Sequence, residues 1–406
     1  MPSKKVFVAR QPIFTVSKRV YAYELLFRGT KTDQAQITDG SRATKSVISN
    51  TFLNIGIDEV TGHRPAFINF TRDLILDESA LLLPPERTIV EILEDIQPDR
   101  ELIEAVRKTK AKGYIFALDD FVCATGYEGL LQLADIVKVD FLQTSPAERK
   151  QLVQRLLAIS PTLSLLAEKV EDYDEFQEAV ELGFHYFQGY FFNKPILITG
   201  RELPGSKVAY LRILQSIHDP TLDYFGLEEV IKTDVSLTTK LLRYINAAAF
   251  PWRKKIESLK QALVLLGENQ VRKWISIVVL SELVQDKPQE LAVLSAVRGR
   301  FCEVAGEESN CRATRLECFM TGILSMLDAM LDVTLDEAIV NIPVSTEVKD
   351  ALKGGENDLG RFLTLAIAYE KGEWDRIPAL CSALGIEESK LPAVYADSVE
   401  WVSKIF

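Results

Sequence analysis

Short β-rich runs alternate with amphipathic helical stretches through about the first 200 residues of the chain. The β-rich runs include VFVAR, AFINF, TIVEIL, YIFALDD and IVKVDF, and the stretches between them include ELIEAVRKTKAKG and YDEFQEAVELG. Strands that alternate with helices pair in parallel, because each crossover helix returns the chain to the same end of the sheet. Eight such runs in this length favour a closed β/α barrel over an open sheet. Irregular pairing remains open for the first strands.

The alternation stops at residues 194–206, KPILITGRELPGS, where two prolines and two glycines interrupt the pattern. Beyond this segment almost every stretch has helical periodicity, as in the apolar stripe that runs from Leu237 to Ile245. We therefore predict an α/β barrel over residues 1–198 and an all-α domain over residues 203–406.

Polar side chains stand near the carboxyl end of most predicted barrel strands, and Glu24, Asn69, Glu91 and Asp119 each share a strand face with apolar residues. In a β/α barrel this end carries the chemistry. A single carboxylate there would be read as a solvated loop residue, but the same pattern on seven strands indicates a shared site. The residues are Glu24, Asn69, Glu91, Glu94, Asp119, Asp120, Lys138, Glu168 and Gln188.

The ligands that these strands offer are carboxylate and amide oxygens, with no histidine or thiolate nearby in the sequence. Oxygen ligands select hard cations, so we expect Mg²⁺ or Mn²⁺. A pair of such ions suits the hydrolysis of a phosphodiester. Lys138 could orient the water or neutralise the transition state, and Arg28 could hold a phosphate. Ordinary salt bridges remain the alternative for these two residues.

Composition excludes several other classes of protein. The chain has 47 Lys and Arg against 58 Asp and Glu, a formal net charge of −11, which disfavours a nucleic acid polymer as partner. No apolar run approaches the roughly 20 residues of a membrane span, and the N-terminus lacks the features of a secretory signal. Five scattered cysteines fit neither a disulfide framework nor a thiolate zinc site. We expect a cytoplasmic protein that does not bind membranes.

The polar residues belong to motifs that run in the order RQPIF, YELLFR, INFT, EILE, LDDF, VKVD, AEKVE and QGYFFNKP. Over residues 5–196 this series resembles the EAL-domain cyclic-di-GMP phosphodiesterases. The resemblance implies a modified TIM barrel that uses Mg²⁺ or Mn²⁺ to open cyclic di-GMP to linear pGpG. It also implies metal ligands Glu24, Asn69, Glu91, Asp119 and Asp120, catalytic residues Lys138, Glu168 and Gln188, substrate contacts Arg28 and Gln11, and loop support by Glu94.

Three departures from the family pattern bear on activity. The signature E-A-L is Glu24-Leu25-Leu26, Val122 replaces the first glycine after the aspartate pair, and Lys169 replaces the glycine of A-E-G-V-E. The retained ligands favour an active phosphodiesterase. A catalytically inactive EAL domain that acts as a cyclic-di-GMP sensor or scaffold is the alternative. A third option is an interaction protein that ignores the nucleotide.

The second half of the chain resembles the HDOD domain, a helical relative of metal-dependent HD phosphohydrolases. The matching segments are TDVSLTTKLLRYINAAAF and IESLKQALVLLGENQVRKWISIVVL. Since this half contains one histidine, His218, we expect no hydrolytic centre in it. We expect a regulatory or interaction module with an unidentified protein partner, and a homodimer is also open. Asn246 is expected to cap a helix rather than to form a site.

Overall fold

The computed structural model describes residues 7–28, 57–119, 126–192, 194, 205–219, 221–232, 235–246, 256, 258–309, 311, 313–340 and 342–406. The chain divides into two compact units. Unit 1 comprises Met1–Phe192 and Tyr369–Trp374, and unit 2 comprises Asn193–Ala368 and Asp375–Phe406.

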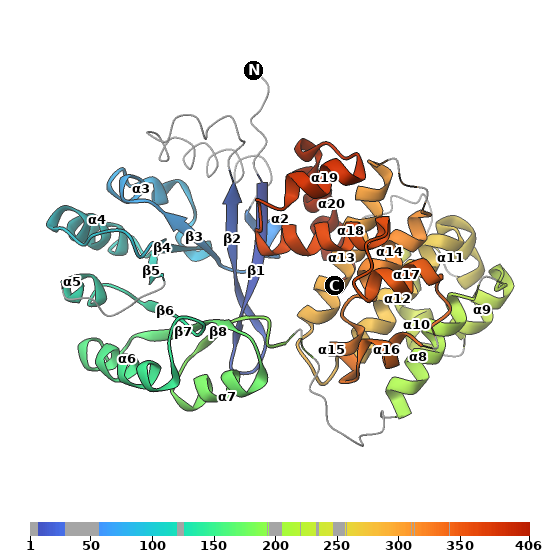
Figure 1. Ribbon diagram of the computed structural model, residues 1–406, viewed down its shortest axis with the longest axis horizontal. Coiled ribbons are helices and arrows are strands. Elements are labelled where there is room, and N and C mark those ends of the chain that lie inside the picture. The colour runs from blue at the N-terminus through green and yellow to red at the C-terminus, as the bar shows by residue number, and fades with distance from the viewer. Residues whose placement is uncertain are drawn as a thin grey trace. The chain divides into compact units, whose positions relative to one another are not determined.

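Unit 1 is built on a closed barrel of eight strands that are hydrogen-bonded in chain order (Figure 1). The closed barrel predicted from the sequence is confirmed. Strands β2 to β8 pair in parallel, whereas β1 is antiparallel to both of its neighbours. Only residues 16–19 join β1 to β2, and so short a link cannot make a crossover. The strands are β1 (Phe7–Thr15), β2 (Val20–Arg28), β3 (Ala66–Phe70), β4 (Thr88–Ile92), β5 (Ile115–Leu118), β6 (Ile136–Asp140), β7 (Ser164–Val170) and β8 (Tyr186–Gly189).

Helices α3 to α7 lie on the outer side of the strands (Figure 1). Local sequence explains where the longer ones begin, since Asp99 and Asp172 each accept a hydrogen bond from a backbone N–H in the first turn of α4 and α7. Gly183 follows α7 with a φ of +89°, which a glycine adopts without strain. The helices of unit 1 are α2 (Ile57–Thr61), α3 (Arg72–Leu76), α4 (Arg100–Lys110), α5 (Glu128–Leu131), α6 (Pro146–Ile159) and α7 (Tyr173–Glu181).

One layer of apolar side chains, contributed by seven strands, fills the barrel interior. All are at most 3% exposed, so the barrel is packed rather than hollow at this level. The layer forms the floor on which any site at the open end must stand. Its members are Ile13, Ala22, Phe67, Ile89, Ala117, Ile136 and Leu166.

All the regular secondary structure among the described residues of unit 2 is helical, as the periodicity predicts. Helix α12 is buried along most of its length, because apolar residues such as Trp274, Ile275 and Val279 occur on every side of it. The second half of the chain contributes α8 (Gly205–Ile217), α9 (Tyr224–Lys232), α10 (Val235–Ile245), α11 (Leu259–Leu266), α12 (Glu268–Leu283), α13 (Glu290–Glu307), α14 (Arg315–Ile323), α15 (Leu327–Leu331), α16 (Leu335–Ile339), α17 (Thr346–Leu352), α18 (Asp358–Lys371), α19 (Ile377–Leu384) and α20 (Leu391–Ser403).

Two details of unit 2 bear on the sequence analysis. Asn246 donates hydrogen bonds to the carbonyls of Leu242 and Ile256 and accepts one from the backbone N–H of Ile256, so it caps α10 as expected. Across the described part of the chain, we find no helix that combines the length and the apolar character of a membrane span.

Candidate active site

A polar layer lies directly above the apolar floor of the barrel. In each of six strands the polar residue stands two positions after a floor residue, so both side chains point into the barrel. In β1 the order is reversed, because this strand runs the other way: Gln11 precedes the floor residue Ile13. The barrel therefore brings together Gln11, Glu24, Asn69, Glu91, Asp119, Lys138 and Glu168, and β8 adds Gln188.

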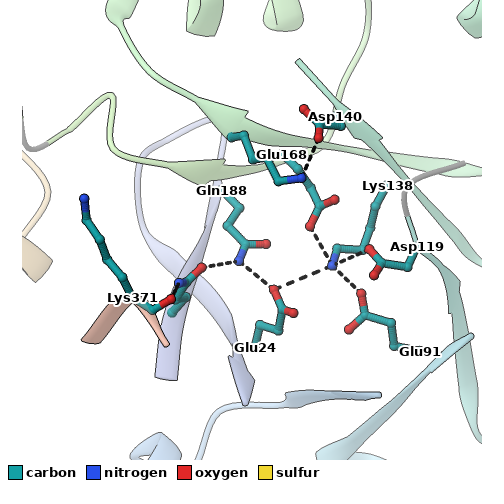
Figure 2. Close-up of polar contacts among 10 residues, drawn as sticks. Glu24, Glu91, Asp119, Lys138, Asp140, Glu168, Gln188 and Lys371 are labelled. Carbon is teal, nitrogen blue, oxygen red and sulfur yellow. Dashed lines mark hydrogen bonds and ion pairs between the residues drawn. The ribbon is translucent and has the colours of Figure 1, made fainter. Parts of the chain in front are cut away.

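Lys138 occupies the centre of this polar layer (Figure 2). Its Nζ lies 2.6 Å from Glu168 Oε1, 3.0 Å from Asp119 Oδ1 and 3.6 Å from Glu24 Oε2, and it donates a hydrogen bond to Glu91. The Lys138 side chain is only 1% exposed, and that of Glu91 is fully buried. One ammonium therefore faces four carboxylates in a site with little access to water.

This excess of negative charge changes the proton affinity of the groups. Burial raises the pKa values of Glu91 and Glu168 well above the usual range, and the neighbouring carboxylates raise them further against the opposing effect of Lys138. Burial alone would lower the pKa of Lys138, but the four carboxylates around it raise that pKa well above its ordinary value. The lysine is therefore held in its charged form, whereas burial next to like charges favours the protonated forms of Glu91 and Glu168.

Several oxygens of the layer are suited to a cation. One carboxylate oxygen from each of Glu91, Asp119 and Glu168 lies within 4.8 Å of the other two. Asn69 Oδ1, Glu91 Oε2 and Gln188 Oε1 are buried and have no hydrogen-bond partner among the described residues. Buried polar atoms normally have partners, so these oxygens indicate that the site binds something with positive charge or hydrogen-bond donors. The donor set is all oxygen, which fits Mg²⁺ or Mn²⁺.

Two glutamines extend the layer to the opposite wall of the barrel. Gln188 Nε2 donates to Glu24 Oε2 at 2.7 Å and to Gln11 Oε1 at 3.1 Å (Figure 2). Gln11 Nε2 in turn donates to the carbonyl of Lys371, in the Tyr369–Trp374 segment that belongs to unit 1, at 3.4 Å. These bonds fix the orientation of the Glu24 carboxylate, which otherwise contacts only Lys138 among the charged groups of the layer.

The backbones of β7 and β8 approach so closely at Val170 that β8 has a glycine at the facing position. A Cβ on Gly189 of β8 would lie 2.2 Å from the carbonyl oxygen of Val170, and the φ of Gly189 is +143°. Only glycine lets the two backbones approach this closely, which explains its place directly after Gln188.

Some predicted residues are not tested by the structure. Asp120 lies outside the described residues, as does the loop over 120–125, and Arg28 is described only by its place on β2. Glu94 is exposed after β4, and its carbonyl accepts a 3.4 Å hydrogen bond from Tyr127 Oη. Support of the loop by its side chain therefore stays a prediction.

The first departure from the family pattern does not alter the polar layer. Leu25, which stands where the family signature has alanine, is a larger side chain next to Glu24 in the sequence. It follows Glu24 on β2, so its side chain points to the opposite face of the strand, where it is 1% exposed. The larger side chain packs outside the barrel mouth and leaves the polar layer unaffected.

Sequence reasoning missed Asp140, the last residue of β6. This carboxylate is buried and pairs with Lys169 Nζ at 2.5 Å (Figure 2). The alternation that singled out Lys138 applies to Asp140 as well, because the two stand two positions apart on one strand. Its place at a strand end was the available signal.

Comparison with known proteins matches both halves of the chain. Residues 35–195 match the model of the EAL domain, and residues 203–341 match that of the HDOD domain. Cyclic di-GMP phosphodiesterase CdgJ of Vibrio cholerae is 35% identical over 98% of this chain and 93% of its own length. Uncharacterized protein YuxH of Bacillus subtilis is 34% identical over 98% of both chains. Among solved structures, a standalone EAL protein from Vibrio cholerae O395 with c-di-GMP bound is 22% identical, with a TM-score of 0.37, over 47% of this chain and 92% of its own.

Proposed function

Since the chain belongs to the family of EAL-domain proteins that carry an HDOD domain, we propose that its barrel hydrolyses cyclic di-GMP to linear pGpG. The observation that carries this proposal is the buried layer in which four carboxylates surround Lys138 while three further oxygens lack partners. A barrel used only as a scaffold has no need of such a costly arrangement. The 35% identical relative CdgJ carries the name of a cyclic di-GMP phosphodiesterase.

Glu24, Asn69, Glu91, Asp119 and Glu168 would hold Mg²⁺ or Mn²⁺. Three of them bring carboxylate oxygens within 4.8 Å of one another, Asn69 has an oxygen without a partner, and Glu24 lies beside them around Lys138. When bound, a pair of such ions lowers the pKa of water and stabilises charge on the oxygens of the phosphodiester. The reaction adds water to phosphorus and breaks the bond from phosphorus to the 3′ oxygen, which takes a proton. The products are the 3′ hydroxyl and the 5′ phosphate of pGpG.

The chain's own side chains supply position and charge for this reaction. Lys138 is held charged by its carboxylate neighbours, so its ammonium can neutralise negative charge that develops on the phosphate. Gln11 and Gln188 lie at the opposite wall, where the second N–H of Gln11 Nε2 can donate to an anionic or base oxygen of the dinucleotide and Gln188 Oε1 can accept from a base N–H. Burial of the layer excludes bulk water and strengthens each of these electrostatic interactions.

The test is incubation of the purified full chain with cyclic di-GMP and Mn²⁺, then Mg²⁺, with detection of pGpG. We expect product, and we expect Glu24→Gln to abolish it, because this change removes a charge at the centre of the layer. Glu181→Ala is the matched control, since Glu181 is exposed at the end of α7. Binding of the dinucleotide without product would support the alternative, a sensor or scaffold, and neither binding nor product would reject both.

We propose a binding role for the HDOD unit in the cytoplasm, with a protein partner. Its single histidine, His218, is buried against Ser276, which leaves it unsuited to hold a metal at the surface. Exposed apolar side chains on α9 and α11, chiefly Phe225 and Val264, support a contact surface. A homodimer remains a prediction, which sedimentation of the full chain would test.

A further inference from the structure

The strand that carries Glu168 departs from regular pairing where it reaches the site. β7 pairs with β8 up to Ala167 and again at Val170, so Glu168 and Lys169 lie in an irregularity between these two pairs. Lys169 has a φ of +54°, a left-handed conformation that residues with a Cβ seldom adopt. Irregularities of this kind redirect side chains next to active sites. Here the irregularity places Glu168 against Lys138.

Strands β6 and β7, which Lys138 and Glu168 already join, have a second contact just beyond the site. Lys169 Nζ lies 2.5 Å from Oδ2 of Asp140, which is 5% exposed at the end of β6. Asp140 stands opposite Glu168 in the register of β6 and β7. The two strands are therefore linked twice, by Lys138 and Glu168 inside the polar layer and by Asp140 and Lys169 at its edge.

Asp140 is itself firmly held. Its Oδ1 accepts hydrogen bonds from the backbone N–H groups of Leu142 and Gln143, and its Oδ2 accepts one from Gln143 Nε2. Although burial raises the pKa of Asp140, the hydrogen bonds from Lys169 and these donors lower it below its ordinary value. Lys169 is thus anchored to a carboxylate that the turn after β6 keeps in place.

We propose that Lys169 is a positioning residue: its pair with Asp140 keeps the end of β7 in the conformation that directs Glu168 at Lys138 and the cation site. The kinetic consequences of this proposal rest on the proposed hydrolysis. Its predicted effect on cation binding does not, because cation binding can be measured without substrate.

Cation binding separates a positioning role from a purely electrostatic one. Removal of an ammonium next to a carboxylate cluster makes the cluster more attractive to Mn²⁺ if nothing moves. If Lys169 positions Glu168, the same removal displaces a ligand and weakens binding. The two roles predict opposite changes in Mn²⁺ affinity.

The experiment compares Lys169→Ala, Lys169→Arg and Lys169→Gly in the full chain, with Mn²⁺ titration by calorimetry and steady-state kinetics on cyclic di-GMP. We expect Lys169→Ala and Lys169→Gly to bind Mn²⁺ roughly threefold or more weakly and to lose roughly tenfold in kcat with KM within about twofold. Lys169→Arg keeps the charge, so it should retain the Mn²⁺ affinity and the kcat of the unmodified protein. Glycine accepts the left-handed conformation, so Lys169→Gly should fold even if the alanine variant does not.

Lys18→Ala is the matched control, because Lys18 is also a left-handed lysine, with a φ of +58°, in the turn between β1 and β2. It should change neither Mn²⁺ affinity nor kcat. Unchanged or tighter Mn²⁺ binding in Lys169→Ala and Lys169→Gly would overturn the proposal, as would an arginine variant as impaired as the alanine variant. Absence of hydrolysis by the unmodified protein would reject the proposed function instead, and the Mn²⁺ titration would still decide the role of Lys169.

Discussion

Lys138 Nζ lies 2.6 Å from Oε1 of Glu168, and both side chains are buried in the mouth of the barrel. The same ammonium contacts Glu24, Glu91 and Asp119, so it compensates charge for the whole layer. Removal of one partner from a buried ionic network leaves the remaining charges uncompensated. The resulting loss of folding stability exceeds the stability that the intact network contributes. The layer therefore depends on Lys138 for stability whenever no cation is bound.

Lys138→Met tests this dependence, because methionine is apolar and still fills much of the space. We expect the metal-free variant to lose about 3–5 kcal/mol of unfolding free energy in urea denaturation, with no hydrolysis. Mn²⁺ should stabilise the variant more than the unmodified protein, because an added cation takes over the lost compensation. Lys150→Met, at an exposed position on α6, should leave stability unchanged. Equal stability of the two variants would show that Lys138 does not compensate the layer.

Chelation should destabilise the unmodified protein. A cation that binds only the folded chain adds about 2.7 kcal/mol at a hundredfold excess over its Kd, so a chelator should lower the melting temperature. Because burial raises the pKa values of Glu91 and Glu168, these groups retain protons that a cation must displace. Affinity for Mn²⁺ should then increase as the pH rises, and binding should release protons.

Calorimetry of Mn²⁺ binding in two buffers of different ionisation enthalpy measures that release. Glu168→Gln removes one of the two titrating groups and should reduce the number of protons released. Identical heats in both buffers, or a melting temperature that does not respond to the chelator, would mean that the layer does not bind the cation in this way.

Much of the barrel and its site follows from sequence, for identifiable reasons. The strand period of two places Glu91 and Lys138 above Ile89 and Ile136, and the parallel order brings these positions to one end of the barrel. The turn over residues 16–19 is too short for a crossover, so the spacing of these two strands already implies the antiparallel pairing of β1 with β2.

Other features depend on geometry that no local pattern specifies. The pairing of Lys169 with Asp140 requires the irregular end of β7, and that irregularity arises from the fit between β7 and β8. The family signature shows only that Leu25, next to Glu24, is larger than the usual alanine. Strand alternation directs the Leu25 side chain to the opposite face of β2, away from the polar layer. Residues 369–374 join unit 1 from far along the chain, and periodicity gives no information on such long-range contacts.

Gly189→Ala should damage both stability and activity. The added Cβ would lie 2.2 Å from the carbonyl oxygen of Val170, so β7 and β8 must separate at the level of Gln188 and Glu168. We expect a loss of about 3 kcal/mol or more in urea denaturation, with loss of hydrolysis. Gly183→Ala is the control, because its φ of +89° carries conformational strain while nothing lies within 4 Å of its Cβ. If the two variants lose equal stability, close packing at Gly189 is not the cause.

His218 should make the stability of unit 2 depend on pH. Burial, with a smaller effect of Arg272, lowers the pKa of His218 from about 6.5 to about 3, and its Nε2 lies 2.8 Å from Ser276 Oγ. The unfolded chain then binds a proton that the folded chain refuses between these two values, so stability falls as the pH drops through this range. Between pH of about 7 and about 4.5 this group alone should remove roughly 2–3 kcal/mol of unfolding free energy.

His218→Gln cannot take up the proton, so its stability relative to the unmodified protein should improve by that amount in urea denaturation at the lower pH. His63→Gln, at a side chain that is 74% exposed, should show no comparable improvement. A His218→Gln difference that stays constant across this pH range would mean that the buried imidazole accepts its proton without unfolding.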